Sequence, residues 1–445
     1  MTDVQAQSAE PSIAPEAMVR AHKPASPSTV YRPPSSVLCP QPSTPKVALL
    51  TAGRDKPYAL GLASSLIAQG LTFDFIGSDG VDSPELHGNP QVNYLKLRNQ
   101  AAAARLLEKI TRVLVYYFRL VRYAAAARPR VFHILWNNKF EWVDRTLLMA
   151  FYKLLGKRIV FTAHNVNAGT RDANDSGLNR LSLEIQYGLC DHIFVHTEKM
   201  KAEMILGFRV SPGKVTVIPF GINNTVPSTA LTPLEAKRKL GINQGDKTLL
   251  FFGHIAPYKG LEFLIEAFKQ LAPSTVHGPP PSAPCPPSDY RLVIAGRPKN
   301  CEDYWRRIQR MISSDRTEDR IIQRIEFIPD EETELYFKAA DVLVLPYTHV
   351  FQSGVLFLAY SFGLPVIAAD VGSLKDEIIE GRTGFGFPAK DSTALAKAIE
   401  AYFSSDLYIN LTDRRQEIRN YANERYSWTK VAAITTQVYS SLIEN

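Results

Sequence analysis

The strongest constraint on the fold is an alternation of short apolar runs with longer amphipathic stretches. Short apolar runs bounded by turn residues are typical of buried strands, and strands that alternate with helices form parallel sheets. In the first half of the chain such runs occupy residues 46–50, 73–76, 131–135, 158–161, 192–195 and 215–218. Helical patterns separate them, for example at 58–69 and 181–190. This half therefore predicts one doubly wound α/β lobe.

The same alternation restarts after a turn-rich segment, Pro219–Pro227. The second set of predicted strands lies at residues 248–252, 291–295, 325–328, 342–345 and 365–368. Together the two sets predict an α/β fold of two Rossmann-like, doubly wound lobes with an interlobe cleft. Ligands of such lobes bind at the carboxyl ends of the strands, so we expect the functional site to face that cleft.

Four segments follow from this pattern. Residues 1–45 are rich in Pro, Ser and Ala and carry no hydrophobic period, so they predict a disordered N-terminal tail. Residues 46–222 predict the N-terminal lobe, and residues 223–413 predict the C-terminal lobe with a Pro-rich surface loop inserted at 273–288. The last segment, 414–445, predicts a helical end.

The composition is that of a globular protein, with 45% hydrophobic and 21% charged residues in a chain of 445. No C-x-x-C pair occurs among the four cysteines, which favours a reducing compartment over a disulfide framework. These cysteines are Cys39, Cys190, Cys285 and Cys301. The sequence contains neither an apolar run that predicts a membrane span nor a signal-peptide pattern. We therefore expect a cytoplasmic protein, located at the inner face of the membrane if the basic helix described next binds lipid.

The net charge of +7 is concentrated in the first lobe, where fourteen Lys or Arg stand against three acids between Lys96 and Arg158. Residues 101–127 predict one long helix in this region. Its predicted apolar face comprises Leu106, Leu107, Ile110, Val113, Leu114, Tyr117, Leu120, Val121 and Ala124. A basic face combines Arg105, Lys109, Arg112 and Arg119 with Tyr116 and Tyr123. The pattern fits a packed helix with a solvated basic face, and the alternative is a peripheral contact with an anionic membrane. No motif indicates nucleic-acid binding.

The clearest candidate for a ligand site is the segment Phe251–Gly260. An apolar strand ends at Gly253, and Lys259 stands directly before a predicted helix that begins near Leu261. Backbone N–H groups at a helix N-terminus favour phosphate, and a lysine there adds a full positive charge. We predict that Lys259 binds a diphosphate, with a solvent-exposed lysine in a tight turn as the alternative.

A second helix start follows the strand predicted at 342–345. Ser353 and Gly354 open a predicted helix that runs to Phe362. Serine is a preferred N-cap, and glycine lets a ligand approach the backbone. Taken alone this segment also fits a plain capped helix. Two such helix starts at the strand ends of one lobe favour a diphosphate site.

These segments resemble a known family. Residues 250–403 look like the donor lobe of family 4 glycosyltransferases, which have the GT-B fold of two Rossmann lobes. The matching pieces are Gly253–Gly260, 328–332, 340–346, 363–368, Gly372 and 381–384, with Phe161–Asn165 in the first lobe. The resemblance covers nearly everything after residue 45 and is stronger in the second lobe.

The resemblance implies roles for single residues. Lys259 would hold the donor diphosphate and assist its departure, in a loop that includes Gly253 and His254. The other donor-binding positions would be the backbone of Ser353, Gly354 and Val355 at the distal phosphate, Ile328 and Pro329 beside the base, and Gly296 near the nucleoside. His164 would face the transferring sugar as a second catalytic residue, although a lone histidine at a strand end is often structural.

The chain also departs from the family pattern. His254 stands where the family often has arginine, a stronger phosphate ligand than a neutral histidine. Val350 and Leu358 stand where the family has a pair of glutamates, one of which binds the ribose. Variants of the family with a Gln-Ser-Gly-Val motif resemble this chain at residues 352–355. Ribose binding must then use other groups.

In the first lobe, Gly53, Arg54 and Asp55 follow the first predicted strand and are candidates for acceptor contact, the alternative being a turn with a surface ion pair. The resemblance implies a hexosyl-type glycosyltransferase that moves sugar from a UDP- or GDP-sugar to a hydroxyl of a saccharide or lipid-linked saccharide. It further implies retention of configuration, no metal or other cofactor, and a place in polysaccharide or glycolipid assembly. Two alternatives stay open: a sugar-nucleotide epimerase, and a nucleotide-sugar-binding protein whose catalysis is weak or lost.

Overall fold

The computed structural model describes residues 46–99, 106–171, 175–222, 226–271, 289–299, 301–314 and 317–444. The predicted tail at 1–45 and the Pro-rich insertion at 273–288 lie outside these described residues, as do the first five residues of the helix predicted at 101–127.

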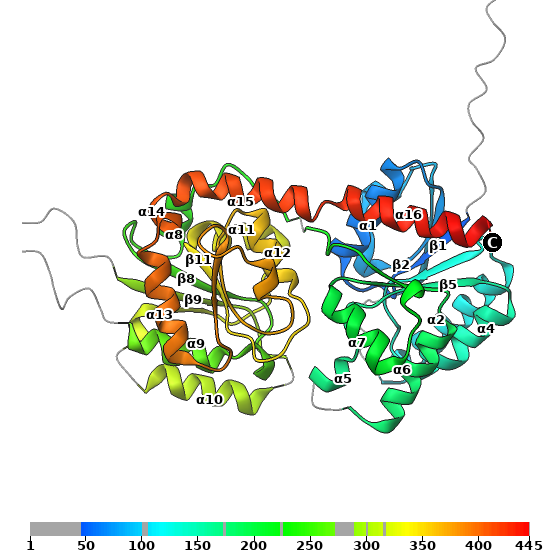
Figure 1. Cartoon of the computed structure of the whole chain (residues 1–445), viewed down its shortest axis with the longest axis horizontal. Helices are drawn as coiled ribbons and strands as arrows, with labels where there is room; N and C mark the ends of the chain where they lie inside the picture. The colour runs from blue at the N-terminus through cyan, green and yellow to red at the C-terminus, as the bar shows by residue number, and fades with distance from the viewer. Residues whose placement is uncertain are drawn as a thin grey trace, which may run out of the picture. The chain divides into compact units, whose positions relative to one another are not determined.

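The first lobe is built on a parallel sheet of seven strands in the order β3-β2-β1-β4-β5-β6-β7 (Figure 1). The strands are β1 (Val47–Leu50), β2 (Phe73–Ser78), β3 (Val92–Arg98), β4 (Val131–Ile134), β5 (Arg158–Thr162), β6 (His192–Val195) and β7 (Val215–Val217). All six predicted strands are present, and β3 is a seventh that the sequence analysis missed. Its sequence alternates apolar with polar residues because it lies at the sheet edge and is only partly buried.

Helices cover both faces of this sheet. They are α1 (Lys56–Ala68), α2 (Leu106–Ala126), α3 (Glu141–Val143), α4 (Met149–Leu154), α5 (Ala168–Arg171), α6 (Gly177–Leu189) and α7 (Glu198–Phe208), with a π-helical turn at Asp144–Leu148 between α3 and α4. Neighbouring residues of β1 point to opposite faces, so that Leu49 packs with α1 while Leu50 packs on the side of α2 and α4.

The apolar face predicted for α2 is buried only in part. Leu120 and Ala124 are buried as expected, but Leu107 and Leu114 are 77% and 61% exposed, whereas Tyr116 of the predicted basic face is buried. The helix rests on its small and aromatic side and leaves its apolar stripe outside. Hydrophobic periodicity identified the helix, but it could not tell which of two partly apolar faces meets the sheet.

The second lobe is built on a parallel sheet of six strands in the order β10-β9-β8-β11-β12-β13. The strands are β8 (Lys247–Phe252), β9 (Tyr290–Ala295), β10 (Ile321–Arg324), β11 (Val342–Leu345), β12 (Val366–Ala369) and β13 (Gly384–Phe387). The strand predicted at 325–328 is wrong. The pairing of β10 with β9 runs from Ile321 to Arg324, and the apolar run after it forms a loop in which Phe327 is 62% exposed.

The helices after β7 are α8 (Pro233–Lys239), α9 (Leu261–Gln270), α10 (Glu302–Ser313), α11 (Asp330–Ala339), α12 (Gly354–Ser361), α13 (Ser392–Phe403), α14 (Asp406–Ile409), α15 (Leu411–Arg425) and α16 (Trp428–Glu444). The predicted helical end is thus divided at Tyr426–Ser427. Figure 1 draws α16 beside α1, and Val431, Ala432 and Tyr439 of α16 belong to the same apolar core as α1. The last helix of the chain therefore completes the first lobe.

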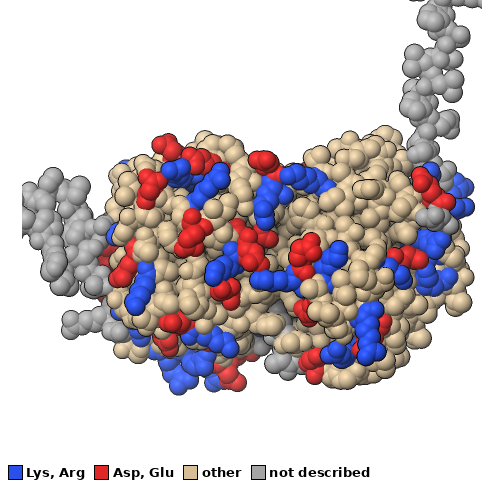
Figure 2. All heavy atoms as spheres, viewed as in Figure 1, with Lys and Arg blue, Asp and Glu red and all other residues tan. Residues whose placement is uncertain are grey.

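On the face drawn in Figure 2, acidic and basic side chains alternate over both lobes rather than gathering by sign. Among the described residues, none of the helices combines the length and the apolar character that a membrane span needs.

Candidate active site

Lys259 is held by a tight turn after the first strand of the second lobe. β8 ends at Phe252, a 3₁₀ turn forms at Pro257–Lys259, and α9 begins at Leu261. Gly260 between them has φ of 63°, and a Cβ there would lie 2.0 Å from the carbonyl oxygen of Pro346. Only glycine fits this position, and the backbone contact ties the Lys259 turn to the loop after β11.

The Lys259 side chain points into the protein and is only 6% exposed. Its Nζ lies 5.3 Å from the ring centre of Tyr347 and 6.0 Å from that of Phe251. No acidic side chain of the described residues forms an ion pair with it. Burial lowers the pKa of the Lys259 amine, and Tyr258 weakly opposes this shift. A desolvated cation held by aromatic rings is suited to an anionic ligand such as a diphosphate.

The loops after β8, β9 and β10 lie against one another. The N–H of Gly253 donates to Ala295 O at 2.9 Å, and the N–H of Gly296 donates to Arg324 O at 2.9 Å. Gly296 has φ of 146°, and a Cβ there would lie 1.9 Å from Gly253 O. The structure thus places the predicted residues Gly253 and Gly296 in backbone contact at the carboxyl ends of neighbouring strands.

His254 lies at the exposed side of this group. Partial burial lowers the pKa of its ring, and the positive charges of Lys299, Lys259 and Arg297 lower it further. The ring is therefore neutral near pH 7 and adds a hydrogen-bonding group, not a charge. The three cations that act on it show that the surroundings of Gly253 are electropositive.

The start of α12 lies beside the same glycine. A Cβ on Gly253 would lie 3.2 Å from Lys259 Nζ and 3.7 Å from Val355 Cγ2. Ser353 occupies the N-cap position but makes no side-chain capping bond, and its Oγ lies 3.4 Å from Tyr347 Oη. Within the described chain, the N–H groups of Gly354 and Val355 have no recorded acceptor. They can bind a ligand oxygen.

Two residues of this loop were missed by the sequence analysis as ligand contacts. Gln352 has a buried amide whose Oε1 and Nε2 both lack a hydrogen-bond partner within the described structure, and the buried Nε2 of His349 also lacks one. Buried polar atoms normally have partners, so both side chains are candidates for ligand contact. The signal was available for Gln352, which precedes Ser353 in the Gln-Ser-Gly-Val motif.

The other second-lobe positions lie in the loop after β10 and in the apolar core of the lobe. Ile328 is buried, and Pro329 is the N-cap of α11. Val350 and Leu358 are both buried in the apolar core of the lobe. Neither can accept a hydrogen bond from a ribose.

His164 lies in an aromatic cluster after β5 in the first lobe. Its ring stacks on Trp136 with centres 4.3 Å apart and meets the edge of Tyr58 at 4.7 Å. Its Nδ1 lies 3.2 Å from His196 Nε2, and its own buried Nε2 has no partner in the described part of the chain. Burial, reinforced by His196 and His133, lowers the pKa of His164 well below its usual value. A neutral ring with one unused nitrogen can bind a hydroxyl group.

Gly53, Arg54 and Asp55 form a strained turn after β1. Ala52, Gly53 and Asp55 have φ of 51°, 66° and 45°. Arg54 Nη2 donates to Asn138 O at 3.2 Å, and Asp55 Oδ1 accepts from the N–H of Tyr58 at 3.3 Å as the N-cap of α1. Left-handed conformations at non-glycine residues are costly and concentrate at functional turns. No ion pair joins Arg54 to Asp55 in the described residues.

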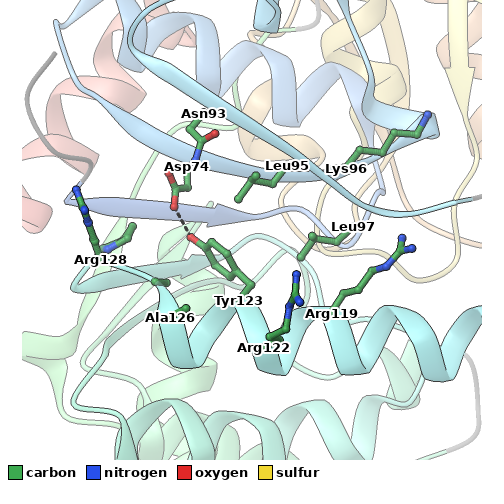
Figure 3. A pocket seen from close by; sticks show the side chains of 12 residues that line it. Asp74, Asn93, Leu95, Lys96, Leu97, Arg119, Arg122, Tyr123, Ala126 and Arg128 are labelled. Atoms are coloured by element: carbon green, nitrogen blue, oxygen red, sulfur yellow. Dashed lines mark hydrogen bonds between the residues drawn. The ribbon is translucent and has the colours of Figure 1, made fainter.

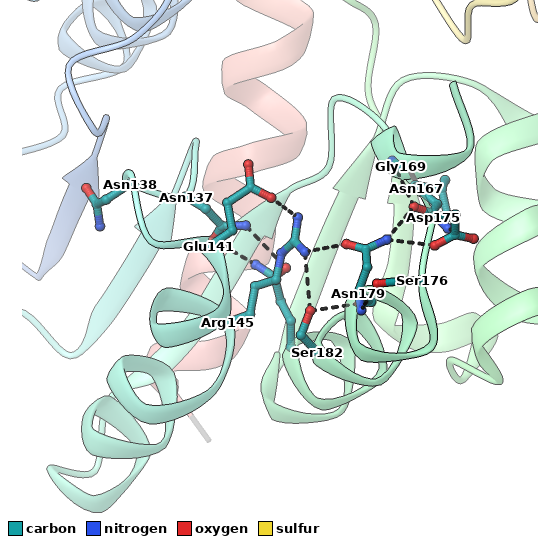
Figure 4. Close-up of polar contacts among 12 residues, drawn as sticks. Asn137, Asn138, Glu141, Arg145, Asn167, Gly169, Asp175, Ser176, Asn179 and Ser182 are labelled. Atoms are coloured by element: carbon teal, nitrogen blue, oxygen red, sulfur yellow. Dashed lines mark hydrogen bonds and ion pairs between the residues drawn. The ribbon is translucent and has the colours of Figure 1, made fainter. Parts of the chain in front are cut away.

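A polar network that the sequence analysis missed lies on the carboxyl side of β4 and β5 (Figure 4). At its centre, Arg145 donates to Glu141 Oε2 at 2.5 Å and to Asn179 Oδ1 at 2.9 Å. Asn179 in turn donates to Asn167 Oδ1 at 3.0 Å, and Asn137 and Gln186 exchange amide hydrogen bonds. The buried Nε of Arg145 has no partner within the described structure. Such a collection of amides and charges is typical of sites that bind hydroxyl-rich ligands.

Each lobe matches a known protein-family model. Residues 57–225 match the model described as Glycosyltransferase Family 4, and residues 246–405 match the model described as Glycosyl transferases group 1. A D-inositol 3-phosphate glycosyltransferase from Corynebacterium diphtheriae is 25% identical over 63% of this chain, which spans 64% of that relative's length. One of the same description from Arthrobacter sp. (strain FB24) is 24% identical over 88% of this chain and 91% of its own.

Solved structures share the fold. Sucrose-phosphate synthase from Thermosynechococcus elongatus superposes with a TM-score of 0.68 at 20% identity, over 90% of this chain and 99% of its own. The Anabaena protein Alr3699/HepE, solved in complex with UDP and glucose, gives 0.66 at 16% identity, over 89% and 99%. At these identities the likeness shows the fold alone. Each lobe thus matches a glycosyltransferase family model, and the chain has the two-lobed GT-B fold of these solved structures.

Proposed function

We propose that the protein transfers a hexosyl group from a nucleoside diphosphate sugar to a hydroxyl of a saccharide or lipid-linked saccharide. The observation that carries this proposal is the buried Lys259 ammonium beside Gly253 and the start of α12. Two kinds of positive group, the Lys259 ammonium and the free N–H groups at the N-terminus of α12, converge there from two loops. A diphosphate is the ligand that such a combination binds best.

The proposed chemistry is stabilisation of the leaving group. As the bond between the sugar and the diphosphate breaks, negative charge grows on the phosphate oxygens. Lys259 and the N–H groups of Gly354 and Val355 would bind that charge more strongly in the transition state than in the donor. From the family resemblance we add retention of configuration and a reaction without a resident metal. His164 would orient the sugar through its Nε2.

The remaining donor contacts are assigned on position. Gly296 would lie near the nucleoside at the end of β9, and Ile328 and Pro329 would lie beside the base. Gln352 and His349 add hydrogen-bonding groups next to Ser353. Because Val350 and Leu358 are apolar and buried, we propose that Gln352 provides polar contacts that the usual glutamates would otherwise make.

The acceptor is assigned to the first lobe. The turn at Gly53–Asp55 and the network around Arg145 both follow the carboxyl ends of β1, β4 and β5. Relatives that are named for D-inositol 3-phosphate make polyols and their phosphates reasonable first acceptors to test, beside saccharides and lipid-linked saccharides of polysaccharide or glycolipid assembly.

Contact with a membrane forms part of the proposal. Along α2, the apolar side chains Leu107, Ile110, Leu114, Phe118 and Val121 recur at helical spacing and are all exposed. An exposed apolar stripe on a basic helix suits the interface of an anionic membrane that carries a lipid-linked acceptor.

The test is a panel of UDP- and GDP-sugars, scored by thermal stabilisation and by release of nucleotide. UDP-glucose enters first because the Anabaena structure holds UDP and glucose. A transferase should be stabilised by its donor and release nucleotide slowly even without acceptor. Stabilisation without release would favour the binding-protein alternative, and interconversion of the sugar would favour an epimerase. No stabilisation by any member would contradict the proposed donor site.

A further inference from the structure

We propose that the hollow between β3 and the C-terminal half of α2 binds the phosphate group of an anionic ligand. This hollow has a volume of about 890 Å³ and opens at the edge of the first sheet (Figure 3). Pockets of that size hold ligands of a phosphate ester's dimensions or larger. None of its lining residues belongs to the proposed donor site, so it would be a second site.

The positive charge of the hollow is largely uncompensated. Three arginines, Arg119, Arg122 and Arg128, line it, against a single acidic residue, Asp74. Lys96 forms an ion pair with Asp79, but within the described chain no acidic partner or hydrogen bond is recorded for the three arginines. Figure 3 shows Arg119 and Arg122 rising side by side from α2. Guanidinium groups bind phosphate through paired N–H donors. Two neighbouring arginines without acidic partners therefore favour phosphate as the ligand of the hollow.

Asp74 does not cancel this charge by direct contact. Its Oδ2 accepts from Tyr123 Oη at 2.6 Å and its Oδ1 accepts from Asn93 Nδ2 at 3.0 Å. Both donors are neutral, and neither carboxylate oxygen pairs with an arginine. Asp74 instead fixes the Tyr123 ring in the wall of the hollow, which keeps the cavity open beside the arginines.

The opposite wall is apolar. Leu95 and Leu97 alternate with Lys96 along β3, so both leucines face α2 while Lys96 points away (Figure 3). Phosphate next to an apolar wall fits a phosphate ester better than the free ion. On α2, Phe118 lies one helical turn from Arg122 and is 69% exposed, so the hollow borders the apolar stripe. The ester could belong to a phospholipid headgroup or to a soluble phosphate ester, and experiment separates the two.

The first arm uses vesicles of phosphatidylcholine alone or mixed with phosphatidylglycerol, in a flotation assay. We expect the full chain to float with the anionic vesicles, and Arg119→Gln/Arg122→Gln to bind them about 30-fold more weakly, because each cationic side chain at an anionic lipid surface contributes about 5-fold. The matched control is Lys109→Gln/Arg112→Gln, which removes the same charge from α2 outside the hollow. Equal loss in both variants would overturn the proposal, since it would indicate diffuse charge attraction alone. Leu114→Ser/Phe118→Ser measures the apolar stripe separately.

The second arm uses glycerol 3-phosphate and inorganic phosphate as ligands, and a thermal shift assay measures whether each one stabilises the protein. It is run in a Lys259→Met background, so that binding at the proposed donor site does not contribute. Stabilisation by glycerol 3-phosphate that Arg119→Gln/Arg122→Gln abolishes, without vesicle binding, would support the pocket and identify a soluble ester as its source. Absence of both vesicle binding and stabilisation would overturn the proposal. The donor panel tests the proposed function by a different readout, so either can fail without the other.

Discussion

At the scale of single residues, the proposed site is centred on a buried lysine, Lys259, that forms no ion pair with an acidic side chain of the described residues. Lys259 is enclosed by Tyr347, Phe251 and the backbone of Gly253, and burial lowers the pKa of its amine. A charge in such surroundings costs folding free energy, and a bound anion returns that energy. Function and stability should therefore respond in opposite directions when the charge is removed.

Substituting Lys259 by methionine tests this. Methionine keeps the length and apolar stem but removes the charge, so we expect kcat/KM for transfer to fall by about 100- to 1,000-fold, the usual effect of losing one group that stabilises a transition-state anion. The free energy of unfolding should stay the same or rise by about 1 kcal/mol. Steady-state kinetics and urea unfolding measure the two effects. Lys397→Met, at an exposed position of α13, is the control, and near-normal transfer by the Lys259 variant would contradict the assignment.

Buried histidines make stability depend on pH. Burial is the main cause that lowers the pKa of His133 to about 3 and that of His196 to about 4. In the unfolded chain both rings bind protons below about pH 6.5, whereas in the folded chain they stay neutral to much lower pH. The free energy of unfolding should therefore fall as the pH falls below about 6.5, by about 1.4 kcal/mol per pH unit for each histidine.

Urea unfolding across this pH range measures the slope. Carboxylates also titrate in its lower part, so the informative comparison is with His196→Gln, which keeps a polar side chain but cannot be protonated. We expect its slope to be smaller by the contribution of one proton. Equal slopes would show that His196 is already protonated in the folded state.

At the scale of elements, the turns that end the strands determine the geometry of the site. Gly260 and Gly241 have nearly the same φ, 63° and 71°, but a Cβ on Gly260 would meet Pro346 O at 2.0 Å, while a Cβ on Gly241 would meet nothing within 4 Å. The pair separates the cost of a left-handed alanine from the cost of a steric clash.

Gly241→Ala should lower the free energy of unfolding by about 1–2 kcal/mol, the cost of placing an L-residue in the left-handed region. Gly260→Ala should cost at least about 2 kcal/mol more, because the loop after β11 must move, and it should weaken donor binding through Lys259. Chemical unfolding and donor-induced thermal shift provide the measurements. Equal destabilisation by the two substitutions would mean that the Pro346 contact is not tight.

The elements that the sequence predicts well are those whose residues are all buried. The buried strands β1, β11 and β12 are continuous apolar runs, so composition alone located them. The edge strand β3 has one polar side, and its alternating pattern is weak. The run after β10 is apolar but contains the exposed Phe327, because the end of the strand is determined by its pairing with β9 and not by its own hydrophobicity.

Some parts of the candidate site could likewise be predicted from the sequence, and others could not. The turns containing Gly253, Lys259 and Ser353 are local in sequence and could be predicted, since a strand end followed by a helix start is visible in one window. The network around Arg145 joins residues of α3, α5, α6 and the loops between them, and the stack of His164 on Trp136 joins two strand ends. Contacts between distant segments leave no periodic signal in a single sequence.

At the scale of the whole molecule, the chain returns at its end to the lobe where it began. Tyr439 of α16 lies 2.5 Å from His133 Nδ1 in β4, and Trp428 Nε1 donates to Ile222 O at 2.9 Å. The Trp428 ring also occupies the space where a Cβ on Gly61 or Gly221 would lie. The stability of the first lobe should therefore be sensitive to changes in α16, far outside its own segment.

Trp428→Ala tests this dependence. Loss of a partly buried tryptophan that packs on Tyr58 at 5.1 Å between ring centres and bonds to Ile222 should cost about 3–5 kcal/mol of unfolding free energy. The lost protection from hydrogen exchange should be confined to α16 and α1, because these two helices share the core that the ring anchors. Trp305→Ala in α10 is the control, since it also removes a partly buried tryptophan but should leave α16 protected. Loss of α16 protection in both variants would show that the two lobes unfold as one unit, and retained protection in Trp428→Ala would show that the remaining core of α16 is sufficient to hold it.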